Sequence, residues 1–196
     1  MKKIIFISAI AAVVIVIVIA VTSAMILLQK SSPEKIHLHS DFKVYLNGQA
    51  YNFTSEKYMS MEGHHLSERT HLHDMNGDII HIHAAGVSLG EFFNSSDIKF
   101  NSTCFVLNNG TSYCNSDNSK IKLYVNGIEN IQMEKYNLKD LDRILITYGN
   151  ESSEQIKSQI DGVTDVSCIY SLKCPERGSP PDESSCVGGN GTMCVG

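Results

Sequence analysis

The chain has 196 residues, a formal net charge of −5 and a pI near 5.9. This length allows one domain of ordinary size, or one domain plus a tail. The mild acidity and the lack of a basic stripe argue against nucleic acid as a partner. Tryptophan is absent and aromatic residues make up only 8% of the chain, which argues against a large aromatic binding platform.

The N-terminus predicts the compartment. Lys2 and Lys3 precede an uncharged apolar run from Ile4 to Leu28. About 20 such residues span a bilayer, whereas the apolar region of a signal peptide is typically about 7–15 residues long. We predict an uncleaved signal anchor at residues 1–30 and a linker at 31–35, in a single-pass protein of the cell membrane whose C-terminal domain is extracytoplasmic. A long cleaved signal is the alternative.

Two further patterns agree with export. An even number of cysteines in an exported domain predicts disulfides. They are Cys104, Cys114, Cys168, Cys174, Cys186 and Cys194. Asn-x-Ser/Thr sequons are typical of a glycosylated surface protein. They are centred on Asn52, Asn94, Asn101, Asn109, Asn150 and Asn190.

Histidines give the strongest chemical signal. All 8 lie between His37 and His83, and His64 and His65 are adjacent. The remaining six form three His-x-His pairs, namely His37 and His39, His71 and His73, and His81 and His83. Side chains at i and i+2 of a strand share one face, so each pair can offer two imidazoles to one metal ion.

Hydrophobic alternation predicts where these pairs lie. Residues 38–46 alternate as a strand with one buried face, and Asn47-Gly48 predicts a tight turn that sets Val44 opposite Tyr51. The first histidine pair then lies on the face away from the apolar layer.

A second hairpin is predicted over residues 70–83. A two-residue Asn-Gly turn would mix its two faces, whereas a three-residue loop with Gly77 left-handed sets Leu72 opposite Ile80 and His71 opposite His81. We adopt the second register, which places all three pairs on the non-core face. This face is expected to be open to water unless the 55–67 loop or the Cys-rich tail covers it.

Capping boxes predict two short helices, one after Ser88 and one over residues 153–163 after Ser152. A third hairpin, turning at residues 108–110, sets Cys104 opposite Cys114 within reach of a disulfide. Further strands are expected at residues 121–125 and 142–148.

These elements predict an α+β ectodomain over residues 36–166, with a mostly antiparallel sheet of hairpins and two short helices. The segment Val87–Gly149, with its Leu-x-Val-Asn-Gly strand and turn and its closing Asp-Arg-Ile-Leu-Ile strand, resembles the β-grasp (ubiquitin-like) layout. Residues 167–196 form a Cys-rich, disulfide-stapled tail. Its four cysteines allow three pairings, of which Cys168–Cys174 with Cys186–Cys194 is the most local.

The histidines exceed what one ion needs, which indicates a multinuclear or buffering site, or two sites. Met59 and Met61 add thioether donors beside His64 and His65, so copper is preferred and zinc is next. Several carboxylates lie near enough in sequence to orient imidazoles, although Asp74 and Asp78 flank a turn and fit a turn-capping role better. These carboxylates are Asp41, Glu62, Glu68, Asp74 and Asp78.

Four phrases carry a family resemblance. They are His-x-His-Ser-Asp-Phe (37–42), His-Leu-His-Asp-x-Asn-Gly (71–77), Ile-His-x-His (80–83) and Cys-Pro-Glu-Arg-Gly (174–178). The chain thereby resembles small membrane-anchored exported proteins of archaea, some labelled protein-disulfide isomerase. The resemblance implies thiol–disulfide chemistry, but this chain lacks the Cys-x-x-Cys motif that such chemistry commonly uses.

Four functions therefore compete. The first is a membrane-anchored, extracytoplasmic metal-binding protein for capture, buffering or delivery of copper or zinc. The others are a three-histidine zinc enzyme of the hydratase or hydrolase type, a thiol–disulfide oxidoreductase, and a structural cell-surface domain. Whether the chain is an enzyme stays open, and the sequence indicates no substrate or protein partner.

Overall fold

The computed structural model describes residues 15, 17–19, 21–22, 36–61 and 63–181 of the chain, which divides into two compact units, Met1–Glu34 and Lys35–Gly196. In the first unit, the described residues are helical and exposed. None of the helices formed by described residues is long and apolar enough to cross a membrane. Most of the predicted anchor and linker, together with Cys186, Asn190 and Cys194, lies outside the described residues.

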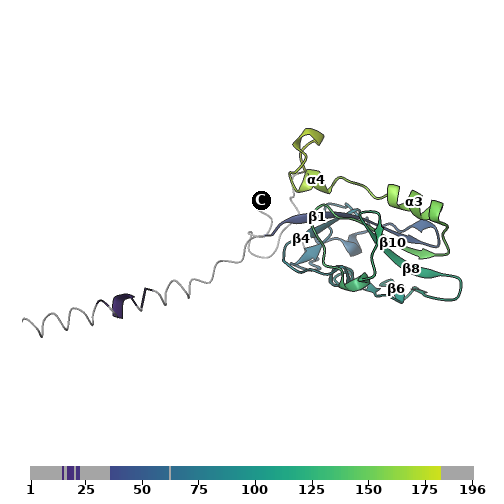
Figure 1. The fold of residues 1–196 in the computed structure, drawn as a ribbon, viewed down its shortest axis with the longest axis horizontal. Coiled ribbons are helices and arrows are strands. Elements are labelled where there is room, and N and C mark those ends of the chain that lie inside the picture. The colour runs from purple at the N-terminus through teal and green to yellow at the C-terminus, as the bar shows by residue number, and fades with distance from the viewer. Residues whose placement is uncertain (1–14, 16, 20, 23–35, 62, 182–196) are drawn as a thin grey trace, which may run out of the picture. The chain divides into compact units, whose positions relative to one another are not determined.

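The second unit is an α+β domain built on one large sheet (Figure 1). The strand order is β3-β4-β1-β10-β8-β9, with β2 also paired to β1. The strands are β1 (Leu38–Leu46), β2 (Gln49–Ala50), β3 (Thr70–His71), β4 (Ile79–Ile82), β8 (Lys120–Val125), β9 (Ile128–Glu129) and β10 (Arg143–Gly149). A smaller sheet has the order β5-β6-β7, formed by β5 (Lys99–Phe100), β6 (Cys104–Val106) and β7 (Ser112–Cys114).

Strands β1 and β10 are parallel neighbours at the centre of the large sheet, whereas every other pairing in it is antiparallel. Helix α2 (Leu89–Asn94) packs its phenylalanines against this sheet, with the Phe92 and Phe42 rings 5.3 Å apart. The parallel central pair includes β1, which lies before the segment 87–149 on which the β-grasp resemblance rested.

Most of the predicted local structure is confirmed. The predicted strand over residues 38–46 is β1, and the Tyr51 amide donates to the Val44 carbonyl at 2.8 Å, as the predicted register requires. His71 lies opposite His81, and Cys104 lies opposite Cys114 with a disulfide between them. Both capped helices form, as α2 and α3 (Ser153–Asp161).

The turn between β3 and β4 differs in detail from its prediction. Asp74 and Met75 adopt the left-handed conformation, with φ of 55° and 56°, and Gly77 does not. Glycine is required at position 77 for another reason, because a Cβ atom there would lie 2.8 Å from the Phe53 carbonyl carbon. The prediction of a left-handed Gly77 was therefore wrong. Glycine is needed at this position because two backbone segments pack closely there.

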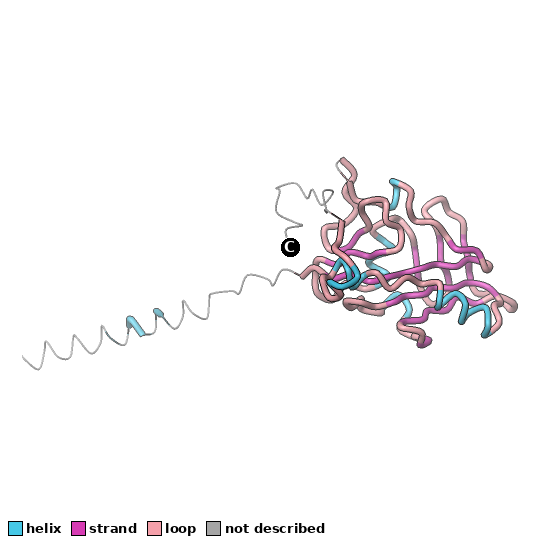
Figure 2. Tube along the Cα trace, turned by 90° about the horizontal axis from the view of Figure 1, so that it is seen from above, coloured by secondary structure: helices cyan, strands magenta, loops and turns pink. Residues whose placement is uncertain are grey.

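The hydrophobic core lies between one face of the large sheet, helix α2 and the small sheet. Phe42 and Val44 of β1 are fully buried there. Helices α3 and α4 (Ser167–Tyr170) lie on the opposite side of β1 and β10 from β6 (Figure 1), and Figure 2 shows the strands crossing the domain. Short 3₁₀ turns complete the described structure at Glu56–Tyr58, Met133–Lys135 and Pro175–Arg177.

Two charged side chains of the central strands hold the segment that links α3 to α4. The buried carboxylate of Asp41 accepts hydrogen bonds from the Thr164 hydroxyl at 2.6 Å and from the Val166 and Ser167 amides at 2.9 and 3.0 Å. Its neighbour across the parallel pair, Arg143, donates to carbonyl oxygens at the end of α3. The start of α4 is thereby placed over β1.

We predict that Asp41→Asn lowers the free energy of unfolding by about 2 kcal/mol, because an amide nitrogen replaces an oxygen that faces backbone donors. Urea unfolding of the full chain, followed by tyrosine fluorescence, measures this loss. Asp78→Asn is the matched control, since Asp78 pairs with Lys43 at a part-exposed site and is expected to cost less than about 1 kcal/mol. Equal losses of unfolding free energy in the two variants would show that Asp41 does not hold the segment between α3 and α4.

Candidate metal centre

Three neighbouring strands bring the His-x-His pairs together. His39 and His71 lie directly opposite His81, one on each side, because β4 pairs with both β1 and β3. All the side chains of the pairs point to the face opposite the hydrophobic core. We call this group the histidine array, and its members are His37, His39, His71, His73, His81 and His83.

The six imidazole rings of the array lie in two rows of three. The first row is His37, His83 and His71, and the second row is His39, His81 and His73. Neighbouring ring centroids are 4.8 and 4.9 Å apart in the first row and 4.6 and 3.6 Å apart in the second. Metal–nitrogen bonds of about 2.0–2.1 Å allow rings at most of these separations to share one ion.

In one group of three histidines, the ring nitrogens themselves lie close together. Ring nitrogens of His37, His81 and His83, one from each, all lie within 4.8 Å of one another. Three imidazoles from two adjacent strands can hold a metal ion and leave a fourth position for another ligand. The metal-binding set predicted from the sequence is thus brought to one place.

The array is covered by the start of the Cys-rich tail, one of the two segments predicted as able to cover it. His39 and His81 are 0% exposed, and His73 is 1% exposed. Helix α4 packs against β1 on this side, and the Tyr170 ring lies 5.6 Å from the His39 ring and 5.8 Å from the His81 ring. His37 and His83 are half-buried and are the most exposed members of the array.

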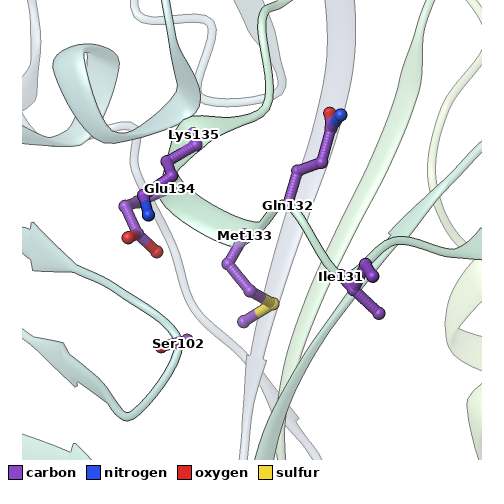
Figure 3. A pocket seen from close by; sticks show the side chains of 6 residues that line it. All are labelled: Ser102, Ile131, Gln132, Met133, Glu134 and Lys135. Atoms are coloured by element: carbon purple, nitrogen blue, oxygen red, sulfur yellow. The ribbon is translucent and has the colours of Figure 1, made fainter.

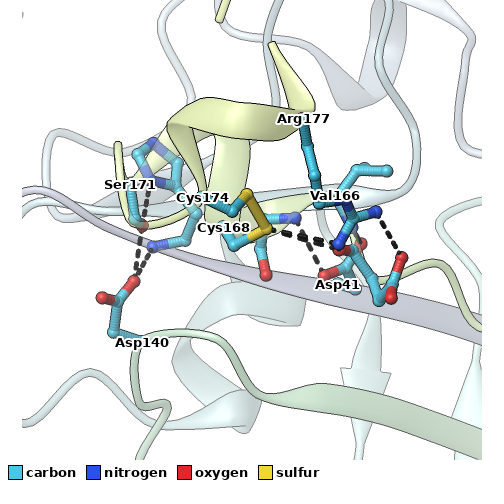
Figure 4. Close-up of a disulfide and its surroundings, with 10 residues drawn as sticks. Asp41, Asp140, Val166, Cys168, Ser171, Cys174 and Arg177 are labelled. Carbon is cyan, nitrogen blue, oxygen red and sulfur yellow. Dashed lines mark hydrogen bonds and ion pairs between the residues drawn. A yellow bond between two sulfur atoms is a disulfide. The ribbon is translucent and has the colours of Figure 1, made fainter. Parts of the chain in front are cut away.

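We call α4 and the loop closed by Cys168 and Cys174 the cover of the array, and a disulfide holds it together. Cys168 and Cys174 are bonded, as the most local pairing predicted, and they close a loop that contains Tyr170 and Ser171. Figure 4 shows the bridge with Ser171 and Asp140 on one side and Arg177, Val166 and Asp41 on the other. The Tyr170 hydroxyl also accepts a hydrogen bond from Asn76, at 2.8 Å, which ties the cover to the β3–β4 turn.

Hydrogen bonds fix the ring orientation of three array members. The Nδ1 atom of His71 lies 2.7 Å from the Ser67 carbonyl oxygen, and that of His73 lies 2.7 Å from the Asp74 carboxylate. Both partners only accept, so each Nδ1 carries the proton and each Nε2 carries the lone pair that a metal ion needs.

His39 is held in the same way through a longer chain. Its Nδ1 lies 2.8 Å from the Ser171 hydroxyl, which itself donates to the Asp140 carboxylate at 2.6 Å. The hydroxyl oxygen must therefore accept from His39, which again leaves the lone pair on Nε2. Burial raises the pKa of Asp140, but hydrogen bonds from Lys173, Ser171 and the His39 amide outweigh it and hold the pKa below its usual value. Asp140 therefore carries a negative charge at neutral pH.

His81, at the centre of the array, is electrically neutral. Burial lowers its pKa well below the usual value for histidine, and the neighbouring histidines lower it further. Both of its ring nitrogens are buried. A neutral imidazole is the form that binds metal ions.

Other predicted ligands lie elsewhere. Met59 is fully buried and bridges to Leu72, whose side chain points away from the histidines into the core, and Met61 packs against the same core. His64 and His65 are exposed. The methionines therefore act as core residues, which removes the thioether argument for copper.

The carboxylates that the sequence placed near the histidines also have different roles and positions. Asp74 orients His73, so the turn-capping role expected for it was wrong; Asn76 caps the turn instead, by accepting from the Asp78 amide. Asp78 pairs with Lys43 at 2.8 Å, and Asp41 holds the start of α4. Glu68 is exposed, and Glu62 lies outside the described residues.

Sequence reasoning missed the partners that orient the array. Ser67, Tyr170, Ser171 and Asp140 contact array histidines. Ser171 and Asp140 lie 132 and 101 residues from His39 in the chain, and no spacing motif links them. The one available signal is the Cys168–Cys174 pair, which encloses Tyr170 and Ser171.

One surface pocket is separate from the array. Figure 3 shows it at the 3₁₀ turn Met133–Lys135, and its lining includes Met133, Glu134 and the exposed Ile131 but no histidine. Elsewhere on the surface, the sequon asparagines among the described residues are all exposed. They are Asn52, Asn94, Asn101, Asn109 and Asn150.

Comparisons with protein-family models, with curated proteins and with solved structures find no match to this chain.

We predict that replacing both Cys168 and Cys174 with alanine uncovers the array. The loop entropy of so short a bridge corresponds to a loss of about 2 kcal/mol in the free energy of unfolding. Modification of His39 and His81 by diethylpyrocarbonate, mapped by mass spectrometry, is expected to become faster.

Alanine at both Cys104 and Cys114 is the matched control, because that bridge belongs to the small sheet and closes a loop of similar length. It is expected to cost similar stability without changing histidine modification. Unchanged protection of His39 and His81 after loss of Cys168–Cys174 would show that the bridge does not hold the cover.

Proposed function

We propose that the chain is a membrane-anchored, extracytoplasmic metal-binding protein that holds copper or zinc in the histidine array. The observation that carries this proposal is the convergence of the His37, His81 and His83 ring nitrogens within 4.8 Å. Hydrogen bonds that direct the Nε2 lone pairs of His39, His71 and His73 support it. Such acceptors behind metal-binding histidines are a common feature of protein metal sites.

The donor set guides the choice of metal. Imidazole suits copper and zinc alike, and copper stands at the top of the affinity order for divalent ions. Copper is the first candidate because of its place in this affinity order, and zinc is the second.

Burial of the array guides the choice of role. A cation beneath α4 is retained longer than one on an open face. Retention suits buffering, or delivery to a partner that opens the cover, better than rapid capture from solution.

The location rests on three observations. Lys2 and Lys3 precede the apolar run from Ile4 to Leu28. Among the described residues every cysteine is in a disulfide, and disulfides persist in oxidising compartments. The described sequon asparagines are exposed, where a glycan can be attached.

We predict that the full chain, purified without a histidine tag, retains at least about one equivalent of copper or zinc after loading and gel filtration. His81→Gln is expected to reduce this content at least tenfold, because His81 lies at the centre of the array. Elemental analysis by mass spectrometry gives the ratio of metal to protein.

The double variant His64→Gln/His65→Gln is the matched control, since these exposed residues lie outside the array. Its metal content is expected to equal that of the parent chain. Less than about a tenth of an equivalent in the parent chain would refute the proposed function, and circular dichroism of each variant shows whether it is folded.

Thiol–disulfide exchange at Cys168–Cys174 is a second candidate function, favoured by one contact. The Arg177 guanidinium lies 3.4 Å from the Cys168 sulfur. A cation there stabilises the thiolate form of Cys168, which makes this sulfur a better leaving group when the bridge is attacked.

We predict that Arg177→Gln slows reduction of this bridge by glutathione about threefold, the effect of raising a leaving-group pKa by about one unit. Mass spectrometry of alkylated samples follows each bridge separately, so Cys104–Cys114 is an internal control. An unchanged rate, or no reduction of insulin by the parent chain, would remove this function.

A further inference from the structure

We propose that the Cys168–Cys174 bridge is a redox switch for the bound ion, and that its reduction by a dithiol speeds release of the ion from the histidine array. This inference rests on the proposed function and adds a form of regulation to it. The ion concerned is the one that His37, His81 and His83 can hold. Its release then depends on a bond that lies outside the array.

The bridge closes the part of the cover that contacts the array. Tyr170 lies between the two cysteines in the chain, and its ring lies 5.8 Å from that of His81, one of the three converging histidines. Ser171 follows Tyr170, and its hydroxyl lies 2.8 Å from Nδ1 of His39, whose ring is 4.6 Å from the His81 ring. Opening the loop therefore removes two contacts from the rings around the ion.

The cover has a fixed start, so it can open without unfolding of the domain. The carboxylate of Asp41 accepts from the Val166 and Ser167 amides, whatever the state of the bridge. Helix α4 has only four residues, and so short a helix is not stable without tertiary contacts. Leu172 adds strain to the closed loop, since its φ of 54° places a residue other than glycine in the left-handed region.

Polar contacts alone oppose the opening once the bridge is broken. They are the hydrogen bond from Asn76 to Tyr170 and the contacts of Asp140 with Ser171 and Lys173. Polar contacts at part-exposed sites each stabilise a closed form only modestly, and thermal motion breaks them. The bridge is the one covalent link between the two ends of this loop.

A reductant reaches the bridge more easily than the array. Leu172 and Arg177, which flank Cys174 in the chain, are exposed, and Cys168 is half-buried, whereas His81 is 0% exposed. The Arg177 guanidinium lies 3.4 Å from the Cys168 sulfur and stabilises the thiolate that reduction can form there.

The step balances with a dithiol as the co-reactant. The S–S bond of the bridge breaks as an S–S bond forms within the dithiol, so two electrons and the two thiol protons pass to the two cysteine sulfurs. The ion keeps its charge throughout. It leaves because solvent and competing ligands reach His81 once the cover has moved.

Zinc release from the full chain tests the proposal, because zinc has no redox chemistry of its own. The zinc-loaded chain is mixed with an excess of a chelating dye, with and without a phosphine reductant, which carries no thiol. We expect release to be about 30-fold faster from the reduced chain, the change in an opening equilibrium that corresponds to the loop entropy of so short a bridge. Mass spectrometry of alkylated samples shows which bridges are reduced.

Two double variants are the matched controls. Cys168→Ala/Cys174→Ala should release zinc at the fast rate without the phosphine and show no response to it. Cys104→Ala/Cys114→Ala lacks the bridge of the small sheet and should respond to the phosphine as the parent chain does. If the parent retains copper but no zinc, release of copper is compared between the parent and Cys168→Ala/Cys174→Ala without a reductant, and should again be faster from the variant.

The outcomes separate this inference from the function on which it rests. A parent chain that retains neither zinc nor copper refutes both. Retained ion whose release is unchanged when the Cys168–Cys174 bridge is reduced or replaced overturns the switch and leaves the proposed function standing. So does a bridge that the phosphine does not reduce in the folded chain. A response to the phosphine that persists in Cys168→Ala/Cys174→Ala belongs to another bridge, which also overturns the inference.

Discussion

The pairing of β4 with strands on both sides is the constraint on which the candidate metal centre depends. Because β1 and β3 both meet β4 in antiparallel register, His39 and His71 lie opposite the same residue, His81. A slip of one residue in either pairing would turn a histidine pair into the core and a row of isoleucines and leucines toward α4. The hydrophobic core on the other face, with Leu72, Ile80 and Ile82 buried, therefore sets the geometry of the array.

Burial then changes what the histidines can do. Imidazoles on an open sheet face would exchange protons and ions freely with solvent. Beneath α4 the central ring is neutral, because burial disfavours its charged form, and acceptors direct the lone pairs of three others. The cover does not rest on the array alone, since Asp41, the Cys168–Cys174 bridge and the Lys173–Asp140 ion pair hold it from β1 and from the loop before β10.

The cover also links the two candidate functions. The loop that Cys168 and Cys174 close contains Tyr170 and Ser171, which contact array histidines. Chemistry at the bridge would therefore alter the environment of a bound ion, even though the described cysteines are all disulfide-bonded.

Local patterns in the sequence determined much of this protein. Alternation and turn residues predicted β1, the β3–β4 register and the Cys104–Cys114 bridge, because each depends on residues close together in the chain. They also predicted which residues form the array, since His-x-His spacing and strand geometry suffice for that. Only the tertiary structure decided that the array is buried, that Met59 belongs to the core, and that Ser171 and Asp140 stand behind His39. The burial of the array and the partners of His39 depend on contacts between segments more than 100 residues apart, which α4 and the loop before β10 make with β1 and which no local pattern records.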